Sequence, residues 1–291
     1  MNRFIVGFVV VVLLIAIVIG QCYGMTEESE AEIASFYSSE KALEEEEEHA
    51  SEPSIDNSSF QKHEEIDLNE IVRIPSDKPH QLLRRTGYCL SYNKETRCPN
   101  RVAWHLIAAH TDGPWPRDRH YYEDMEVPAP RSTDNDYHRS GWTRGHMCPA
   151  GDNKWDSIAM SESNMLTNIC PQNAELNSGV WNRIEMDCRK WAKRYGSVYI
   201  VCGPLFYNKE HETIGANKVV VPEAFFKVIL CLQGKPKAIG FVVKNNAGTK
   251  KKDQYVNTVD EVERMTGYDF FPALSDDIEE VVEANADIKE W

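Results

Sequence analysis

The strongest periodic pattern in the chain lies in residues 175–195. Apolar side chains recur there at steps of three and four residues: Leu176, Val180, Ile184, Cys188 and Trp191. This spacing is typical of the buried face of an α-helix. Gly196 follows directly and is a common helix terminator. The pattern predicts a long amphipathic helix over residues 175–195.

Five runs of β-branched, aromatic and other apolar residues predict a sheet: 88–92, 101–107, 198–202, 224–232 and 238–243. A polar turn at 93–97 separates the first two runs, and a turn at 233–237 separates the last two. Each of these pairs predicts a β-hairpin. We also expect helices over 152–163 and 258–266 and a short strand over 165–169.

Residues 112–138 carry no clear period and are rich in proline. The sequence predicts a long irregular loop there, and loops of this length often carry function. Its arginines, Arg117 and Arg119, could bind phosphate, although solvated loop arginines are more common.

The first 24 residues predict export from the cell. An apolar run at 4–20 follows the single charge of Arg3, and Cys22 and Gly24 are small enough for signal peptidase. This arrangement indicates a signal peptide over 1–24 and a secreted or periplasmic protein. The alternative is a membrane anchor formed by residues 4–20, a run at the short end of the spanning range.

Charge divides the rest of the 291-residue chain into three parts. Residues 25–80 hold 17 acidic against 4 basic residues, which predicts an acidic, disordered leader. The leader could be a solubilising spacer or an acidic mimic of nucleic acid. Residues 81–268 carry a net charge of +5 and form the predicted domain, and 269–291 form an acidic, partly helical tail. The mildly basic charge of this domain does not exclude a nucleic-acid substrate.

The cysteine pattern favours an oxidising compartment over zinc binding. None of the eight cysteines forms a C-x-x-C pair. Cys89 and Cys98 flank the first hairpin turn, where a local disulfide is expected if geometry allows it. Cys202 and Cys231 lie on separate predicted strands and could face each other or simply pack.

The tripeptide Arg144-Gly145-His146 is the first candidate for chemistry. Histidine is the side chain most easily poised as a base near neutral pH, and arginine is suited to phosphate. Glycine between them allows a close approach of the backbone.

A second candidate lies on the predicted helix, where Asn177, Trp181 and Glu185 follow each other at steps of four. They share one helix face. An amide oxygen and a carboxylate suit a hard cation that keeps most of its waters. Each residue also has an ordinary explanation, since Asn177 could cap the helix and Glu185 could be an exposed charge.

Together these motifs resemble a known family. The segments 140–150, 168–177 and 181–185 read SGWTRGHMCPA, NICPQNAELN and WNRIE. In order and spacing they are similar to the DNA/RNA non-specific endonucleases, over roughly residues 86–268. The resemblance implies an α+β fold, the ββα-metal (His-Me finger) nuclease fold, with a central, mostly antiparallel sheet flanked by helices.

The resemblance also implies roles for individual residues. His146 would be the general base that deprotonates the attacking water, and Asn177 would be the direct protein ligand of Mg²⁺, or alternatively of Mn²⁺. Glu185 would orient metal-bound water, and Arg144 would lie near the scissile phosphate. The remaining residues would support the site or bind substrate: Arg119, with Arg117 as its alternative, Asn168 and Gln172. Thr143 departs from the family pattern, which usually has Asp at this position.

The implied activity is Mg²⁺-dependent endonucleolytic cleavage of DNA and RNA without sequence preference. Two alternatives belong to other classes. One is a cysteine hydrolase that uses Cys148 with His146, and the other is a nucleic-acid-binding protein with a decayed site. No stable protein partner can be inferred, and a homodimer is left open.

Overall fold

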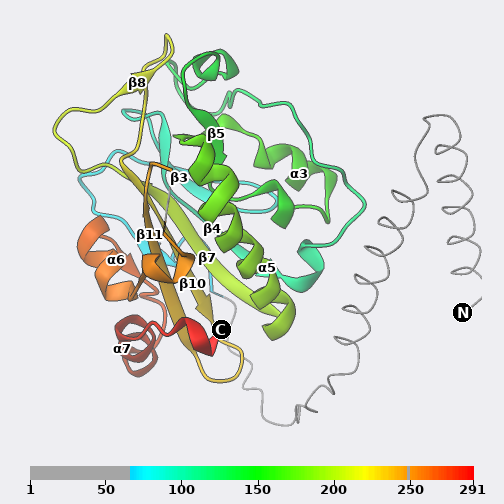
Figure 1. Ribbon diagram of the computed structural model, residues 1–291, viewed down its shortest axis with the longest axis vertical. Helices are drawn as coiled ribbons and strands as arrows, with labels where there is room; N and C mark the ends of the chain where they lie inside the picture. The colour runs from blue at the N-terminus through cyan, green and yellow to red at the C-terminus, as the bar shows by residue number, and fades with distance from the viewer. Residues whose placement is uncertain (1–65, 248–249) are drawn as a thin grey trace, which may run out of the picture. The chain divides into compact units, whose positions relative to one another are not determined.

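A seven-stranded antiparallel sheet forms the centre of the computed structural model, which describes residues 66–247 and 250–291 (Figure 1). Its strands, in spatial order, are β12 (Val256–Asn257), β11 (Lys237–Lys244), β10 (Ala224–Cys231), β7 (Ser197–Leu205), β4 (Cys98–Ile107), β3 (Cys89–Asn93) and β2 (Gln81–Arg84). Both predicted hairpins form, as β3–β4 and β10–β11. The predicted α+β architecture with a central antiparallel sheet is confirmed.

Helices cover both faces of the sheet (Figure 1). Helix α5 (Asn182–Tyr195) packs on β7 and β4, whereas α6 (Val259–Thr266) and α7 (Asp276–Ala284) pack on β11. Successive strand residues point to opposite faces, so Trp104 belongs to the core under α5 and Ala103 to the core under α6.

The predicted helix over 175–195 forms, but it is not continuous. It comprises α4 (Ala174–Leu176), a π-helical segment (Asn177–Trp181) and α5. Gly179 leaves the helical region, with φ −98° and ψ −115°. The apolar positions of the pattern are buried as predicted. Such π-helical bulges are frequent at functional sites.

Shorter elements differ more from the predictions. Residues 165–169 do not form a strand: a 3₁₀ turn (Leu166–Asn168) precedes strand β6 (Ile169–Gln172). The helix expected over 152–163 is confined to α3 (Ser157–Ser163). The other small elements are β1 (Val72–Arg73), β5 (Thr143–His146), β8 (Thr213–Ile214), β9 (Val219–Val220), β13 (Asp269–Phe270) and 3₁₀ turns at Ala108–His110, Asp134–Tyr137, Ala150–Asp152, Lys252–Tyr255 and Ile288–Glu290.

The fold extends beyond the predicted boundaries of 81 and 268. Strand β1, from the predicted leader, pairs with β13, from the predicted tail. Phe270 is fully buried, and Trp291 packs against Trp191 with tilted rings whose centroids lie 4.7 Å apart. Net charge alone does not predict that the tail belongs to the fold, because acidic residues of the tail are interspersed with apolar residues that pack on the sheet. The predicted signal peptide and residues 25–65 of the leader lie outside the described residues.

The seven cysteines in the described residues are buried free thiols. The predicted Cys89–Cys98 disulfide is wrong, because these residues lie at different levels of the β3–β4 ladder, opposite Ala103 and Asn93. Cys202 and Cys231 do not face each other either. Across the ladder they lie opposite Lys227 and Lys237.

Candidate active site

The candidate site is built on a small two-stranded ladder outside the central sheet. Strands β5 and β6 pair antiparallel, with Thr143 opposite Gln172 and His146 opposite Ile169. Helix α4, the π-helical segment and α5 follow β6 directly. This β-β-α arrangement brings the Arg144-Gly145-His146 motif next to the start of the helix.

Gly145 is required by the close packing of these two strands. A Cβ atom on Gly145 would lie 2.6 Å from the Cβ of Gln172, well inside a normal contact. Gln172 is fully buried, and its amide atoms have no hydrogen-bond partner in the described part of the chain. Its position is therefore set by packing and by the β5–β6 ladder.

Asn168 fixes the chain on the far side of His146. Its Oδ1 accepts the backbone N–H of Cys148 at 2.9 Å. Its Nδ2 donates to the carbonyl oxygens of Cys148 at 2.8 Å and Ser163 at 2.7 Å. This fully buried amide therefore joins the segment after β5 to the end of α3. The supporting position predicted for Asn168 is consistent with these contacts.

The side chain of Asn164 determines which nitrogen of His146 carries the proton. Asn164 Nδ2 donates to the carbonyl oxygen of Asp118 at 2.9 Å, which turns its Oδ1 towards His146. Oδ1 lies 2.8 Å from His146 Nε2 and can only accept, so Nε2 is the donor. In the neutral ring Nδ1 then holds a free lone pair.

His146 is neutral under physiological conditions. It is only 6% exposed, and burial lowers its pKa to about 4. The hydrogen bond to Asn164 raises the pKa, and the charge of Arg117 lowers it further. The imidazole is therefore unprotonated at Nδ1 above about pH 5, the form that a general base requires.

Arg144 is held at the edge of the site by an ion pair. Its Nε donates to Asp134 Oδ1 at 2.5 Å, and its Nη2 donates to the carbonyl oxygen of Asp134 at 2.9 Å. The guanidinium lies 5.3 Å from the ring centroids of Tyr121 and Tyr137. These contacts fix the plane of the group and leave Nη1 without a hydrogen bond to any described residue, which suits it to binding a phosphate oxygen.

Asn177 is oriented by the residue that departs from the family pattern. Its Nδ2 donates to Thr143 Oγ1 at 3.1 Å, and Thr143 Oγ1 donates to the carbonyl oxygen of Gln172 at 2.8 Å. Thr143 therefore supplies a support at the position where Asp is usual. Asn177 does not cap the helix, because Asn173 does so through the backbone N–H groups of Glu175 and Leu176.

The amide of Asn177 fits the metal implied by the fold. Its nitrogen is engaged, so its Oδ1 is left as an acceptor with no hydrogen bond in residues 66–247 and 250–291. A neutral oxygen donor of this kind matches the preference of Mg²⁺ or Mn²⁺ for oxygen ligands.

Glu185 lies two turns further along the helix and is half-buried. Burial raises its pKa to about 7; the charge of Lys227 lowers the pKa and that of Asp152 raises it, while Arg189 and Arg117 lower it. Glu185 is therefore half-buried among other charged groups. It is not the exposed helix charge that the sequence offered as its ordinary explanation.

A buried group of charges lies beneath Glu185. Lys227 is fully buried, and its Nζ lies 5.0 Å and 4.7 Å from the ring centroids of Trp104 and Trp181. Asp152 accepts from Trp104 Nε1 at 3.1 Å and from Arg189 Nη1 at 2.8 Å. With Glu185, these groups form two cations and two carboxylates, so the buried charge is balanced.

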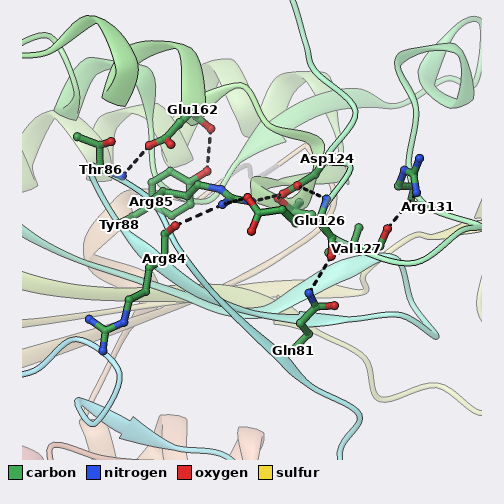
Figure 2. Close-up of polar contacts among 11 residues, drawn as sticks. Gln81, Arg84, Arg85, Thr86, Tyr88, Asp124, Glu126, Val127, Arg131 and Glu162 are labelled. Carbon is green, nitrogen blue, oxygen red and sulfur yellow. Dashed lines mark hydrogen bonds and ion pairs between the residues drawn. The ribbon is translucent and has the colours of Figure 1, made fainter.

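The long loop predicted over 112–138 is anchored by a buried ion pair (Figure 2). Arg85 contacts Asp124 and Glu126, each at 2.6 Å, and the Arg85 and Asp124 side chains are 4% and 3% exposed. Asp124 also accepts from Thr167 Oγ1 at 2.6 Å, which ties the loop to the segment before β6.

This loop carries Arg117, whose side chain is exposed. The charge of Arg117 acts on both His146 and Glu185. Arg119 is exposed and makes no hydrogen bond or ion pair with any described residue. Of the two loop arginines considered from the sequence, Arg117 is the one that the fold places within electrostatic reach of the site.

Cys148 does not have the environment of a nucleophile. It is fully buried, and burial raises the pKa of its thiol well above the usual value. Its sulfur accepts from Asn153 Nδ2 at 3.4 Å. A protonated, buried thiol is inert, so the geometry disfavours a cysteine hydrolase.

The β-β-α unit, with histidine on the first strand and asparagine on the helix, defines the ββα-metal class of nucleases. Residues 69–277 match the family model for DNA/RNA non-specific endonucleases. The chain belongs to this family.

Known proteins agree with this assignment. The chain is 41% identical over 208 residues to the mitochondrial nuclease EXOG of Xenopus laevis, covering 66% of this chain and 58% of that one. It is 32% identical over 209 residues to the mitochondrial endonuclease G of Bos taurus, covering 67% and 70%. A solved structure of the EndoG/EndoGI complex matches with a TM-score of 0.63 at 31% identity, covering 68% of this chain and 88% of that one.

Two further facts follow from these comparisons. The chain spans less than two thirds of the length of the EXOG relative. Both named relatives are mitochondrial proteins, a finding that contradicts the predicted secreted or periplasmic location. The alternative, a membrane anchor formed by residues 4–20, lies outside the described residues. Within residues 66–247 and 250–291, no helix is long and apolar enough to cross a membrane.

Several residues at the site were not found from the sequence. Asn164 carries no motif and reaches His146 only through the fold. Arg189 lies one turn after Glu185, a spacing that could have suggested it. Lys227 interrupts an otherwise apolar strand, and a lysine within such a run signals a buried charge with a specific role.

Replacing Asn164 by Asp tests the role of this residue in setting the state of His146. A carboxylate beside Nε2 favours the imidazolium and so raises the pKa of His146 by about 1–3 units. A general base must be unprotonated, so we expect activity to be lost as pH falls through this pKa. We expect the acid limb of the nucleolytic kcat/KM profile to move to higher pH by at least about one unit.

The matched control is Asn285→Asp, the same change at an exposed position on the C-terminal segment. Its pH profile should coincide with that of the wild type. An unshifted acid limb in Asn164→Asp, with the variant folded, would show that Asn164 does not control the protonation of His146.

Proposed function

We propose that this protein is a metal-dependent endonuclease that hydrolyses phosphodiester bonds of DNA and RNA without sequence preference. The observation that carries the proposal is the arrangement around β5 and β6. A neutral histidine with a free Nδ1 lies on one strand, and an asparagine with a free Oδ1 follows the other. Family membership supports the same activity.

In this proposal, Nδ1 of His146 accepts a proton from the attacking water. The water oxygen bonds to phosphorus, and the bond from phosphorus to the leaving ester oxygen breaks. Asn164 holds the His146 ring in the tautomer that this transfer needs. Its Oδ1 also stabilises the positive charge that develops on the ring when Nδ1 takes up the proton.

Cations of the chain would hold the phosphate during this step. Arg144 and Arg117 would bind non-bridging oxygens and offset the negative charge that builds up in the transition state. These contacts involve the backbone of the nucleic acid, which carries no sequence information, so cleavage would be largely indifferent to base sequence.

Asn177 would hold a Mg²⁺ or Mn²⁺ ion through Oδ1, and Glu185 would orient its water ligands. When bound, such an ion acts as a Lewis acid that stabilises charge on phosphate oxygens. The raised pKa of Glu185 means that its carboxylate form, which this role needs, is favoured as pH rises through about 7.

A cleavage assay with the His146→Ala variant tests the proposed activity. The wild type should degrade supercoiled plasmid and single-stranded RNA in Mg²⁺ and leave both intact in EDTA. Loss of a general base typically costs about 10²–10⁴-fold, and we expect His146→Ala to lower kcat/KM by that factor. His80→Ala, at an exposed position, is the control and should cut at the wild-type rate.

Either of two results would refute nuclease function by this mechanism. One is that the wild type leaves both substrates intact in Mg²⁺. The other is that His146→Ala cuts as fast as the wild type.

Replacing Asn177 by Ala tests the proposed metal ligand. Loss of the direct oxygen donor should raise the Mg²⁺ concentration needed for half-maximal cleavage by at least about tenfold, since even supporting residues of metal sites are worth about 10–100-fold. Asn182→Ala, on the next helical segment, removes an amide bonded only to the Met186 sulfur and serves as control. An unchanged Mg²⁺ titration in Asn177→Ala would rule out this ligand.

We further propose that the protein acts in mitochondria, on the support of the names of its relatives and of its buried free thiols. After fractionation of expressing cells, we expect the protein in the mitochondrial fraction, protected from added protease until the organelle is lysed. Recovery from the culture medium would contradict this proposal.

A further inference from the structure

A group of carboxylates lies between the two C-terminal helices. Asp260 and Glu263 on α6 and Glu283 on α7 each contribute one carboxylate oxygen, and these three oxygens lie within 4.8 Å of one another. The two helices pack side by side on β11 (Figure 1). The group lies under the sheet face opposite α5, so it is separate from the candidate active site.

Glu283 is the unusual member of this group. It is only 9% exposed, and its Oε1 has no hydrogen-bond partner in the described parts of the chain. Asp260, by contrast, is exposed. Buried polar atoms are nearly always paired, and an unpaired buried carboxylate oxygen indicates a partner that the protein atoms do not supply.

The charges around Glu283 are acidic. Glu263, Glu279, Asp260 and Asp269 all act on it, and together with burial, which is the main cause, they raise its pKa to about 8. The charge of Arg73 on β1 acts on Glu279, and Arg73 pairs with Asp269 at 3.2 Å between exposed side chains. A positive charge is therefore lacking where the carboxylates converge.

Glu263 is already oriented for such a partner. Its Oε1 accepts the backbone N–H of Phe270 at 2.7 Å, which fixes the carboxylate against the β13 strand. Thr258 and Glu261 form a capping box at the start of α6, so the turn that carries Asp260 is also fixed. The ligand set therefore needs little ordering before it can bind.

We propose that Asp260, Glu263 and Glu283 form a binding site for a divalent cation of the calcium type, which links α6 to α7. Calcium takes six to eight oxygen ligands at about 2.3–2.6 Å, so any two of its ligand oxygens lie no more than about 5 Å apart. The three carboxylate oxygens, all within 4.8 Å of one another, satisfy this limit. Mg²⁺ demands shorter distances and stricter geometry. Water and backbone carbonyls would complete the shell.

The expected consequence of the bound cation is a more stable C-terminal segment. The cation would bind the native arrangement of α6 and α7 and not the unfolded chain, so it would raise the melting temperature. The site would thereby strengthen the attachment of the residues that follow β13, which the β1–β13 pairing and Trp291 already hold to the sheet.

Thermal melts of the full chain test this site without any measurement of nuclease activity. The Asn177→Ala background removes the contribution of the proposed catalytic ion. In that background, 10 mM CaCl₂ should raise Tm by about 3–8 °C relative to EDTA at equal ionic strength, if binding is in the range of about 0.1–1 mM. MgCl₂ should give a smaller rise.

Glu283→Gln is the decisive variant, because it keeps the shape of the side chain and removes its charge. In EDTA its Tm should stay close to that of its parent, because the raised pKa of Glu283 already favours the uncharged form at neutral pH, but its rise in CaCl₂ should be lost. Glu280→Gln, on the exposed side of the same helix, should keep the full rise. Absence of a rise in the Asn177→Ala parent, or a full rise in the variant that also carries Glu283→Gln, would overturn the proposal.

Discussion

The antiparallel pairing of β5 with β6 is the constraint on which the candidate site depends. It places Thr143 opposite Gln172 and His146 opposite Ile169, and so sets the distance between the histidine and the helix that follows β6. Gly145 permits this pairing because no larger residue fits against Gln172. The hydroxyl of Thr143 then reaches Asn177, so one short ladder positions both His146 and Asn177.

Around this ladder, burial and neighbouring charges together set the protonation states of His146 and Glu185. Burial keeps His146 neutral, while burial alone would keep Glu185 protonated. Lys227 and Arg189 counter this effect on Glu185, and Asp152 balances them in turn. A buried charge is tolerated only when it is paired, so the aromatic walls around Lys227 and the ion pair of Asp152 belong to one electrostatic unit.

The two faces of the sheet support different parts of the protein. The face under α5 supports the candidate site, whereas the face under α6 and α7 closes the fold with the first and last described strands. The acidic tail belongs to this second face. Its apolar residues Phe270, Phe271 and Val282 are buried and complete the core on that face.

The sequence by itself determined the long helix, both hairpins and the family, because apolar periodicity and local motifs depend on residues close in the chain. His146, Arg144, Asn177 and Glu185 could be singled out for the same reason. Only the tertiary structure decided that Asn164 orients His146, that the charge of Arg117 acts on His146 and Glu185, and that the seven described cysteines are unpaired. It also joined residues 66–80 and 269–291 to the domain. These contacts link residues far apart in sequence, and neither spacing nor composition records which distant side chains will meet.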